Sequence, residues 1–455
     1  MDNDEMANAL ARFADERIGP EGHVVTGLTR LSGGASRETF SLDLVAPDGT
    51  TTPAVVQRVR GSTVLSVPTM VGEGELLQAA ARGGVAVAPV LGASDDPSII
   101  GAPFVLMARV EGETLARKIL RDDEFADARR SVVAQCGDAL ARIHALSTDV
   151  APHLRAADPV DQLVGLLDSL GEPHPAFELA IGWLTANRPA EVEPRVVHGD
   201  FRLGNLIVGP DGLRAVLDWE LAHLGDPMED LGWLCVRAWR FGSAPPVAGL
   251  GTYDELFDAY AAAAGSPVDA EAVHWWEVLG TLKWGVICIL QTAGHLTGAS
   301  RSVELAAIGR RIVENEYDVL RLLGADELAP APIGPVASGD GYDAGPHDRP
   351  TAPELVEAVR EFLEGDVMAA TSGRVQFHAR VAAKVLATVE RELAAGPAMA
   401  AAHRERLAAL GFADDGALAA AIRAGELDTR RDEVLASVYA SVLDKLAVAN
   451  PTYAG

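Results

Sequence analysis

Residues 198–205 read His-Gly-Asp-Phe-Arg-Leu-Gly-Asn, and residues 217–220 read Leu-Asp-Trp-Glu. Between these two motifs lie two apolar runs, residues 206–208 and 213–217, which flank a Gly-Pro-Asp-Gly sequence at 209–212. Two apolar runs on either side of such a turn predict a β-hairpin. The polar residues of the two motifs should therefore lie at the open end of this hairpin.

These polar residues are spaced for metal and phosphate chemistry. A hairpin brings Asn205 beside Asp218, with Asp200 five residues upstream on the same edge. Two carboxylates and an amide oxygen suit Mg²⁺, a hard cation that prefers oxygen ligands and shares its other positions with phosphates. The order Asp, five residues, Asn, hairpin, Asp is that of a kinase catalytic loop and the metal-binding Asp that follows it. Arg202 would then point at the transferred phosphoryl group. The alternative is an ordinary surface hairpin with polar ends.

Together with Gly225-Asp226-Pro227, the two motifs resemble the aminoglycoside phosphotransferase family of small-molecule kinases. The resemblance extends over about residues 20–325. It implies a bilobal, protein-kinase-like fold with ATP between the lobes and Mg²⁺ as cofactor. It also implies that Asp200 is the catalytic carboxylate, assisted by Arg202, and that Asn205 and Asp218 are the metal ligands.

Three further residues are expected to support this site. His198 should pack under the catalytic loop, because Asp200 already supplies the carboxylate on the acceptor side. Glu220 ends the Leu-Asp-Trp-Glu motif. Asp226 has two interpretations, since the family's Asp steadies the catalytic loop, whereas Asp226-Pro227-Met228-Glu229 is also a capping box that begins a helix.

The resemblance also assigns residues to the nucleotide. A glycine-containing turn fits a loop whose backbone amides approach phosphates, and its candidates are Ser32, Gly33, Gly34, Ala35 and Ser36. An apolar strand at 104–107 precedes the expected hinge, where backbone groups of Ala108, Arg109 and Val110 would bond adenine.

The cation expected on the third strand departs from the usual pattern, because the first lysine of the chain is Lys118. Arg58 is the candidate, since an arginine can also grip phosphate, and one branch of the family resembles this chain in using Arg. Its expected partner is Glu75, with Glu73 as the alternate. Arg58 could instead be a solvated residue of an edge strand.

The organisation of the chain predicts an α+β fold with a small β-rich lobe, a larger helical lobe and a small all-α domain. We place the first lobe at 1–110, with an N-terminal helix, and the helical lobe with its catalytic loop at 111–328. A linker rich in proline and glycine follows at 329–352. Apolar stripes at helical spacing mark 353–455 as an accessory domain, which resembles a helical domain of unknown function. These stripes would pack on the kinase lobe or form a homo-oligomer.

Composition excludes some classes of partner. Acidic residues number 65 against 38 basic ones, for a formal net charge of -27. Such a surface argues against binding nucleic acid or an anionic membrane, which both require clustered Lys and Arg. Three separated cysteines and an acidic N-terminus predict a cytoplasmic protein rather than a secreted one.

The acceptor is expected to be a hydroxyl group of a small molecule. The catalytic loop looks more like the kinase-like domains joined to acyl-CoA dehydrogenases, which favours a hydroxyacyl-CoA or a hydroxy acid. The acidic surface would suit an aminoglycoside, whereas Arg237 and Arg240 favour an anionic acceptor. Two alternatives remain: a nucleotide-binding regulatory module without turnover, and a metal-dependent hydrolase built on His198, Asp200 and Asp218.

Overall fold

The computed structural model describes residues 1–19, 21–31, 37–59, 69–150, 158–328 and 350–454. The predicted phosphate loop, Ser32 to Ser36, and most of the predicted linker lie outside these residues. The described chain forms two compact units, one of residues 1–157 and 190–277 and one of residues 158–189 and 278–455. The domain boundaries expected from the sequence stay predictions.

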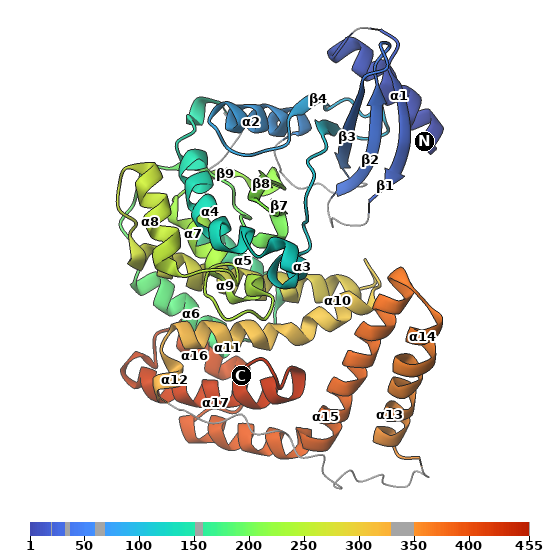
Figure 1. The fold of residues 1–455 in the computed structure, drawn as a ribbon. Coiled ribbons are helices and arrows are strands. Elements are labelled where there is room, and N and C mark those ends of the chain that lie inside the picture. The colour runs from blue at the N-terminus through green and yellow to red at the C-terminus, as the bar shows by residue number, and fades with distance from the viewer. Residues whose placement is uncertain (20, 32–36, 60–68, 151–157, 329–349, 455) are drawn as a thin grey trace. The chain divides into compact units, whose positions relative to one another are not determined.

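The first unit begins with a five-stranded antiparallel sheet, ordered β1-β2-β3-β5-β4 (Figure 1). Its strands are β1 (Val24–Arg30), β2 (Arg37–Val45), β3 (Thr51–Val59), β4 (Val90–Ser94) and β5 (Phe104–Ala108). Helix α1 (Asn3–Arg17) packs on the sheet near β1 and β4, and helix α2 (Met70–Arg82) packs on β4 and β5.

The two faces of this sheet belong to different cores. Side chains alternate between faces along a strand, so Phe40 of β2 and Val56 of β3 join one core with Leu10 of α1. Val105 of β5 joins the other core with Leu76 of α2. The position of a residue along its strand therefore decides whether its side chain faces α1 or α2.

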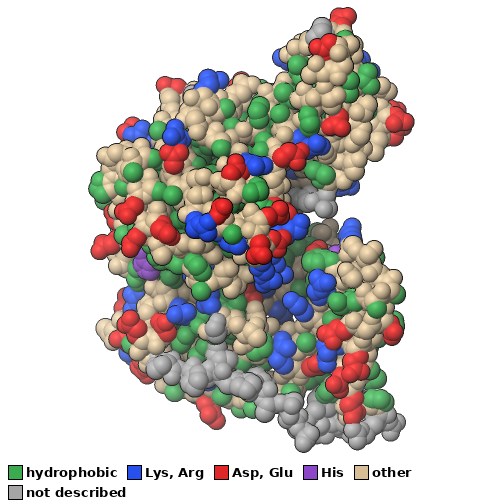
Figure 2. Space-filling model, viewed as in Figure 1, with side chains coloured by type: hydrophobic (Ala, Val, Ile, Leu, Met, Phe, Trp, Pro, Cys, Tyr) green, Lys and Arg blue, Asp and Glu red, His purple; other side chains and the backbone are tan. Residues whose placement is uncertain are grey.

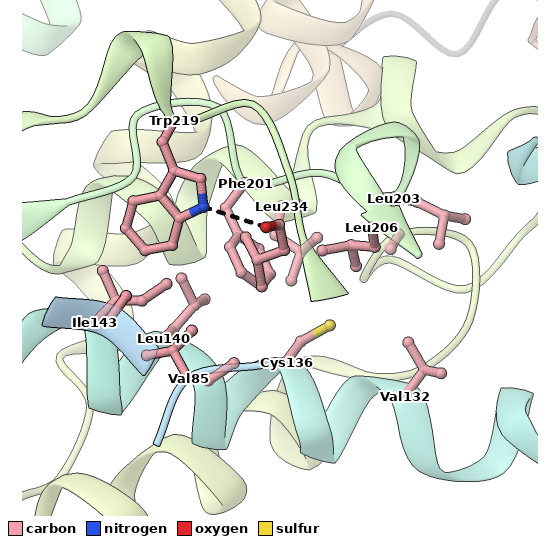
Figure 3. Close-up of a cluster of buried hydrophobic side chains, with 14 of the residues drawn as sticks. Val85, Val132, Cys136, Leu140, Ile143, Phe201, Leu203, Leu206, Trp219 and Leu234 are labelled. Carbon is pink, nitrogen blue, oxygen red and sulfur yellow. Dashed lines mark hydrogen bonds between the residues drawn. The ribbon is translucent and has the colours of Figure 1, made fainter. Parts of the chain in front are cut away.

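The rest of the first unit is mainly helical and contains two small antiparallel β-pairs. Its helices are α3 (Ala116–Arg121), α4 (Ala128–His144), α7 (Met228–Cys235) and α8 (Tyr253–Ala264), and its β-pairs are β6 (Arg195–Val197) with β9 (His223–Gly225) and β7 (Leu206–Gly209) with β8 (Gly212–Val216). Apolar side chains pack between the hairpin and α4, among them Phe201, Leu206 and Leu140 (Figure 3). The Trp219 indole Nε1 donates to the carbonyl of Val216 at 3.2 Å, which ties this core to the end of β8.

The second unit is helical throughout its described residues. Its helices are α5 (Pro159–Leu170), α6 (Pro175–Ala186), α10 (Val303–Ile308), α11 (Ile312–Leu322), α12 (Ala325–Leu328), α13 (Ala352–Phe362), α14 (Met368–Ala370), α15 (Gly373–Leu410), α16 (Asp415–Arg423) and α17 (Arg431–Ala449), and α9 (Ala270–Leu296) contributes its C-terminal part. The predicted all-α C-terminal region is confirmed.

The predicted apolar stripe of α17 is buried, since Leu435, Val438, Val442 and Leu446 are all less than 8% exposed. Helix α17 packs on α11, and α16 packs on α6. Arg423 of α16 reinforces the second contact, because it donates to Glu178 of α6 at 2.6 Å. A cavity of about 400 Å³ lies within this unit, lined by residues of α6, α11, α15 and α17.

Acidic and basic side chains are interspersed over the surface of the first unit that Figure 2 shows, in keeping with the formal net charge of -27. None of the helices among the described residues combines the length and the apolar character that crossing a membrane requires. The β-rich lobe, the helical remainder and the all-α region together confirm the predicted α+β, kinase-like fold.

Candidate active site

The predicted hairpin is formed, and it brings its polar ends together. Leu206 pairs with Val216, and the amide of Leu217 donates to the carbonyl of Asn205 at 2.8 Å. Asp218 follows Leu217 directly, so Asn205 and Asp218 border the open end of the hairpin. The sequence spacing was sufficient for this prediction because the whole arrangement is local.

The carboxylate of Asp200 accepts hydrogen bonds from three side chains. The Trp233 indole Nε1 donates to Oδ1 at 2.8 Å, and Arg202 Nε donates to the same oxygen at 3.0 Å. Asn205 Nδ2 donates to Oδ2 at 2.6 Å. Three donors fix the orientation of this carboxylate, and the charged donor strengthens its bond. The structure therefore brings together Asp200, Arg202 and Asn205, as the sequence spacing indicated.

Arg202 has a second contact that holds it in place. Its guanidinium lies over the Trp239 ring, 4.9 Å from the ring centroid, in cation–π geometry. Trp239 packs against Trp233, with 5.2 Å between the ring centroids. The two tryptophans thus hold Arg202 and Asp200 from one side.

The catalytic loop itself is held by Asp230, which the sequence analysis missed. Asp230 is fully buried in α7 and accepts from the amides of His198 at 2.8 Å and Gly199 at 2.9 Å. Burial raises the pKa of Asp230, but its hydrogen bond with the His144 side chain and the hydrogen bond from the His198 amide lower the pKa overall. A sequence signal could have revealed Asp230. It is a carboxylate next to Leu231 and near Leu234, the apolar residues on the buried face of the helix.

Gly199 is required at its position in this loop. Its φ is +77°, in the left-handed region that glycine adopts without strain. A Cβ at this position would lie 2.4 Å from the carbonyl oxygen of Leu221, so any other residue would displace the backbone.

The side chain of Asp226 bonds the start of α7 and an indole. Its carboxylate accepts from the amide of Met228 at 2.9 Å and from the Trp276 indole at 3.1 Å. Glu229 accepts from His223 Nε2 at 3.0 Å, so its side chain bonds β9 instead of the backbone at the start of α7. Asp226 therefore contacts the first residue of α7, but the predicted capping box is not formed, because Glu229 bonds His223 instead.

His198 lies under the loop as expected. It is fully buried, its Nε2 lies 2.9 Å from the carbonyl of Leu217, and the amide of Asp200 donates to its Nδ1 at 3.2 Å. Burial lowers the pKa of His198, so the ring is neutral and donates through Nε2. The ring thereby connects the catalytic loop to the end of β8.

Asp218 lies near other carboxylates. Its backbone is left-handed, with φ 65° and ψ 62°. Burial raises its pKa to about 7, with further contributions from Glu220, Asp200 and Glu73, while Arg37 opposes the shift. A cation would stabilise this cluster of carboxylates. No group of three His, Cys, Asp or Glu side chains among the described residues forms a complete metal site, so a metal here would take other ligands as well.

The predicted pair of Arg58 and Glu75 is not formed. Arg58 Nη2 lies 2.8 Å from Glu38 of β2, and its Nη1 donates to the carbonyl of Ile100 at 2.9 Å. Its guanidinium lies over the Phe40 ring in the core that contains α1. Glu75 is exposed on α2. The prediction was wrong because the order of strands along the chain does not determine which face an individual residue occupies.

The buried carboxylate of α2 is the alternate, Glu73, and its partner is Arg37. Arg37 Nη2 donates to Glu73 at 2.7 Å, and Arg37 Nε donates to Glu220 at 3.1 Å. Arg37 comes directly after the predicted phosphate loop, and the sequence analysis overlooked it. The contact of Glu220 with the site is therefore its hydrogen bond with Arg37.

The expected hinge is partly engaged within the protein. The amide of Ala108 donates to the carbonyl of Pro89 at 2.8 Å, and that of Arg109 donates to Pro53 at 2.9 Å. The Arg109 side chain bonds Ser41 at 2.9 Å. Of the three predicted hinge amides, those of Ala108 and Arg109 are therefore already bonded within the protein, and Val110 stays the candidate for binding adenine.

Comparison with known proteins agrees with this geometry. Residues 27–273 match the phosphotransferase enzyme family, and residues 369–453 match a domain of unknown function, DUF6285. The chain is 28% identical over 327 residues to acyl-CoA dehydrogenase family member 10 of Mus musculus, an alignment of 67% of this chain and 30% of that protein. It is 25% identical over 282 residues to family member 11 of the same species, an alignment of 57% of this chain and 35% of that protein. The chain thus spans about a third of these relatives.

A solved structure has the same fold. A protein of Ralstonia eutropha assigned to the aminoglycoside phosphotransferases aligns with 68% of this chain and 95% of its own length, with 20% identity and a TM-score of 0.54. Because the family match covers residues 27–273, more than half of the 455 residues, the chain belongs to the phosphotransferase enzyme family and has its kinase-like fold.

Proposed function

We propose that this protein transfers the γ-phosphate of ATP to a hydroxyl group of a small molecule. The observation that carries this proposal is the cluster at the open end of the β7–β8 hairpin. There the Asp200 carboxylate is oriented by Arg202, Asn205 and Trp233, and Asp218 follows Leu217, whose amide donates to the carbonyl of Asn205.

In this proposal Asp200 orients the acceptor hydroxyl and accepts its proton as the oxygen attacks phosphorus. Asn205 and Trp233 would keep the Asp200 carboxylate in one orientation during the reaction, which reduces the entropy lost on reaching the transition state. Arg202 would leave Asp200 for the transferred phosphoryl oxygens, while Trp239 keeps its guanidinium near the site. Phosphoryl transfer depends largely on such positioning and on charge stabilisation.

The residues present fit a Mg²⁺ ion. Asn205 and Asp218 would hold it. Burial and the neighbouring carboxylates both raise the pKa of Asp218, and a divalent cation would neutralise this excess of negative charge. When bound, Mg²⁺ supplies positive charge to the phosphate oxygens. The nucleotide base would lie at the hinge near Val110.

For the acceptor, we favour a hydroxyacyl-CoA or a hydroxy acid over an aminoglycoside. Support comes from the loop sequence around Arg202 and from the relatives named as acyl-CoA dehydrogenase family members. Arg240 no longer supports an anionic acceptor, because it bonds the carbonyl of Cys235 and the buried Glu277. The acidic surface, which includes Asp254, Glu255 and Asp258 of α8, remains the argument for an aminoglycoside.

The test is ADP release with Mg²⁺ and ATP over a panel of hydroxyacyl-CoA thioesters, free hydroxy acids and aminoglycosides. We expect turnover with one acceptor class, and Asp200→Asn should lower it by about 100- to 10,000-fold while nucleotide binding persists. Asp211→Asn, in the exposed turn of the same hairpin, is the matched control. Equal turnover in Asp200→Asn would exclude Asp200 as the catalytic carboxylate.

The second candidate is a regulatory module that binds nucleotide without turnover. The observation that favours it is the arrangement of β3, whose arginine faces α1. Nucleotide binding without ADP release for any acceptor in the panel would support this candidate. The hydrolase alternative lacks support, because both ring nitrogens of His198 are engaged in hydrogen bonds with backbone groups.

Self-association through residues 353–455 also stays a proposal. Leu355, Val359 and Phe362 of α13 are each more than half exposed. Such an apolar stripe is typical of a contact surface. Light scattering on the wild type and on Phe362→Glu should show a dimer or larger species that the variant loses.

A further inference from the structure

The first observation is the position of the charged residues on the two faces of the N-terminal sheet. Arg58 of β3 pairs in register with Glu38 of β2, on the face that packs against α1. Arg37, the neighbour of Glu38, projects from the opposite face. There it contacts Met70 and Glu73, which both belong to α2.

The same alternation identifies the β3 residue on the α2 face. Gln57 precedes Arg58 and pairs in register with Val105, which is buried in the core that contains α2. The β3 side chain next to Arg58 on the α2 side is therefore an uncharged amide. The cation that reaches the buried carboxylate of α2 comes from β2 instead.

Arg37 connects α2 to the segment that follows the hairpin. It is 6% exposed and donates to Glu73 of α2 and to Glu220, two residues after Asp218. Its contact with Glu220 places Arg37 next to the segment that carries Asp218. Arg37 thus lies at the metal side of the site, whereas Arg58 is separated from α2 by the thickness of the sheet.

We propose that Arg37 of β2 supplies the protein's cationic contact to the nucleotide phosphates and that its ion pair with Glu73 positions it for this. The inference rests on the proposed function and assigns its phosphate contact to a different strand from the one expected. A guanidinium has five N–H donors. Glu220 and Glu73 each take one and Met70 lies against a third nitrogen position, so donors remain for phosphate oxygens.

Binding of adenosine, ADP and ATP measured by calorimetry separates a phosphate contact from a purely structural role. Arg37→Gln should weaken ADP and ATP binding by about 10- to 100-fold, the range for a hydrogen bond to a charged group, and should leave adenosine binding within about twofold. Arg37→Lys should recover part of the lost affinity. Arg58→Gln, on the other face, should leave all three affinities within about twofold.

Arg37→Gln leaves Glu73 buried without its partner, so this variant could fail to fold. The double variant Arg37→Gln with Glu73→Gln removes both charges, and it should show the same selective loss of ADP and ATP. Unchanged ADP affinity relative to adenosine in a folded Arg37 variant would overturn the inference, as would a selective loss in Arg58→Gln. If the wild type binds no nucleotide, the proposed function itself fails.

Discussion

Arg37 and Arg58 lie on neighbouring strands of one sheet, and each pairs with a carboxylate, but they face opposite cores. Arg58 bonds Glu38 and the carbonyl of Ile100 on the α1 face. Arg37 bonds Glu73 and Glu220 on the α2 face, near Asp218. The difference teaches that the side of the sheet, rather than the identity of the strand, decides which arginine can act on the nucleotide.

The largest effect should come from the metal side of the α2 face. Asp218→Asn removes a charged ligand from the proposed Mg²⁺ site, and we expect kcat to fall by about 100-fold or more, because metal charge stabilisation contributes several kcal/mol. The measurement is ADP release across a Mg²⁺ titration. A wild-type rate at the wild-type Mg²⁺ concentration would show that the metal is bound elsewhere, and it would contradict the placement of the metal on the α2 side of the site.

The next effect concerns the support of the catalytic loop. Asp230→Asn weakens the acceptor for two loop amides and for His144, and the free energy of unfolding should fall by about 1–3 kcal/mol. Urea unfolding followed by tryptophan fluorescence measures this change. Asp226→Asn, just before the same helix, should cost less, since among the described residues Asp226 accepts from one helix amide and one indole and holds no amide of the catalytic loop.

Asp230 should also make the stability of the protein depend on pH. The ordinary pKa of an aspartate is about 3.9, and the pKa of Asp230 in the folded protein lies below that value. Its contribution to stability is therefore complete above about pH 4 and is lost as the pH falls through the folded pKa. The groups that face it are His144 and the His198 and Gly199 amides. Asp230→Asn should flatten the acid limb of the stability profile, and an unchanged limb would contradict this assignment.

A smaller effect sharpens the comparison of faces. In the Arg37→Gln background, Gln57→Lys returns a cation to the α2 face from β3 and should recover about 3- to 10-fold of the ADP affinity. Arg58→Lys in the same background is the control, since its side chain stays on the α1 face. Equal recovery by both lysines would show that the face of the sheet is not the deciding factor.

The smallest effect is expected from Arg58 itself. Arg58→Gln should lower the free energy of unfolding by about 1 kcal/mol, because the pair is partly exposed and Glu38 keeps Arg30 as a partner. Thermal unfolding without nucleotide measures this loss. An equal shift of the melting temperature by saturating ADP in the variant and the wild type would confirm that Arg58 has no part in nucleotide binding.

The hairpin and the grouping of Asp200 with Asn205 could be predicted because local spacing and turn chemistry determine them. The partner of Glu73 on α2 could not be predicted in the same way. It depends on which face of the sheet each arginine occupies, and that face is determined by the packing of the sheet against α1 and α2. Asp230 is thirty residues beyond Asp200 and meets the loop only through tertiary packing. The indole bond from Trp233 to Asp200 escaped the sequence analysis for the same reason, since a tryptophan on a helix usually indicates core packing.

The most direct test is a crystal structure of the protein with ADP and Mg²⁺. It should show the phosphates on the α2 side of the sheet, with Arg37 within hydrogen-bond distance of a phosphate oxygen and the metal held by Asn205 and Asp218. Phosphates bound by Arg58, or a metal bound away from Asn205 and Asp218, would contradict the account.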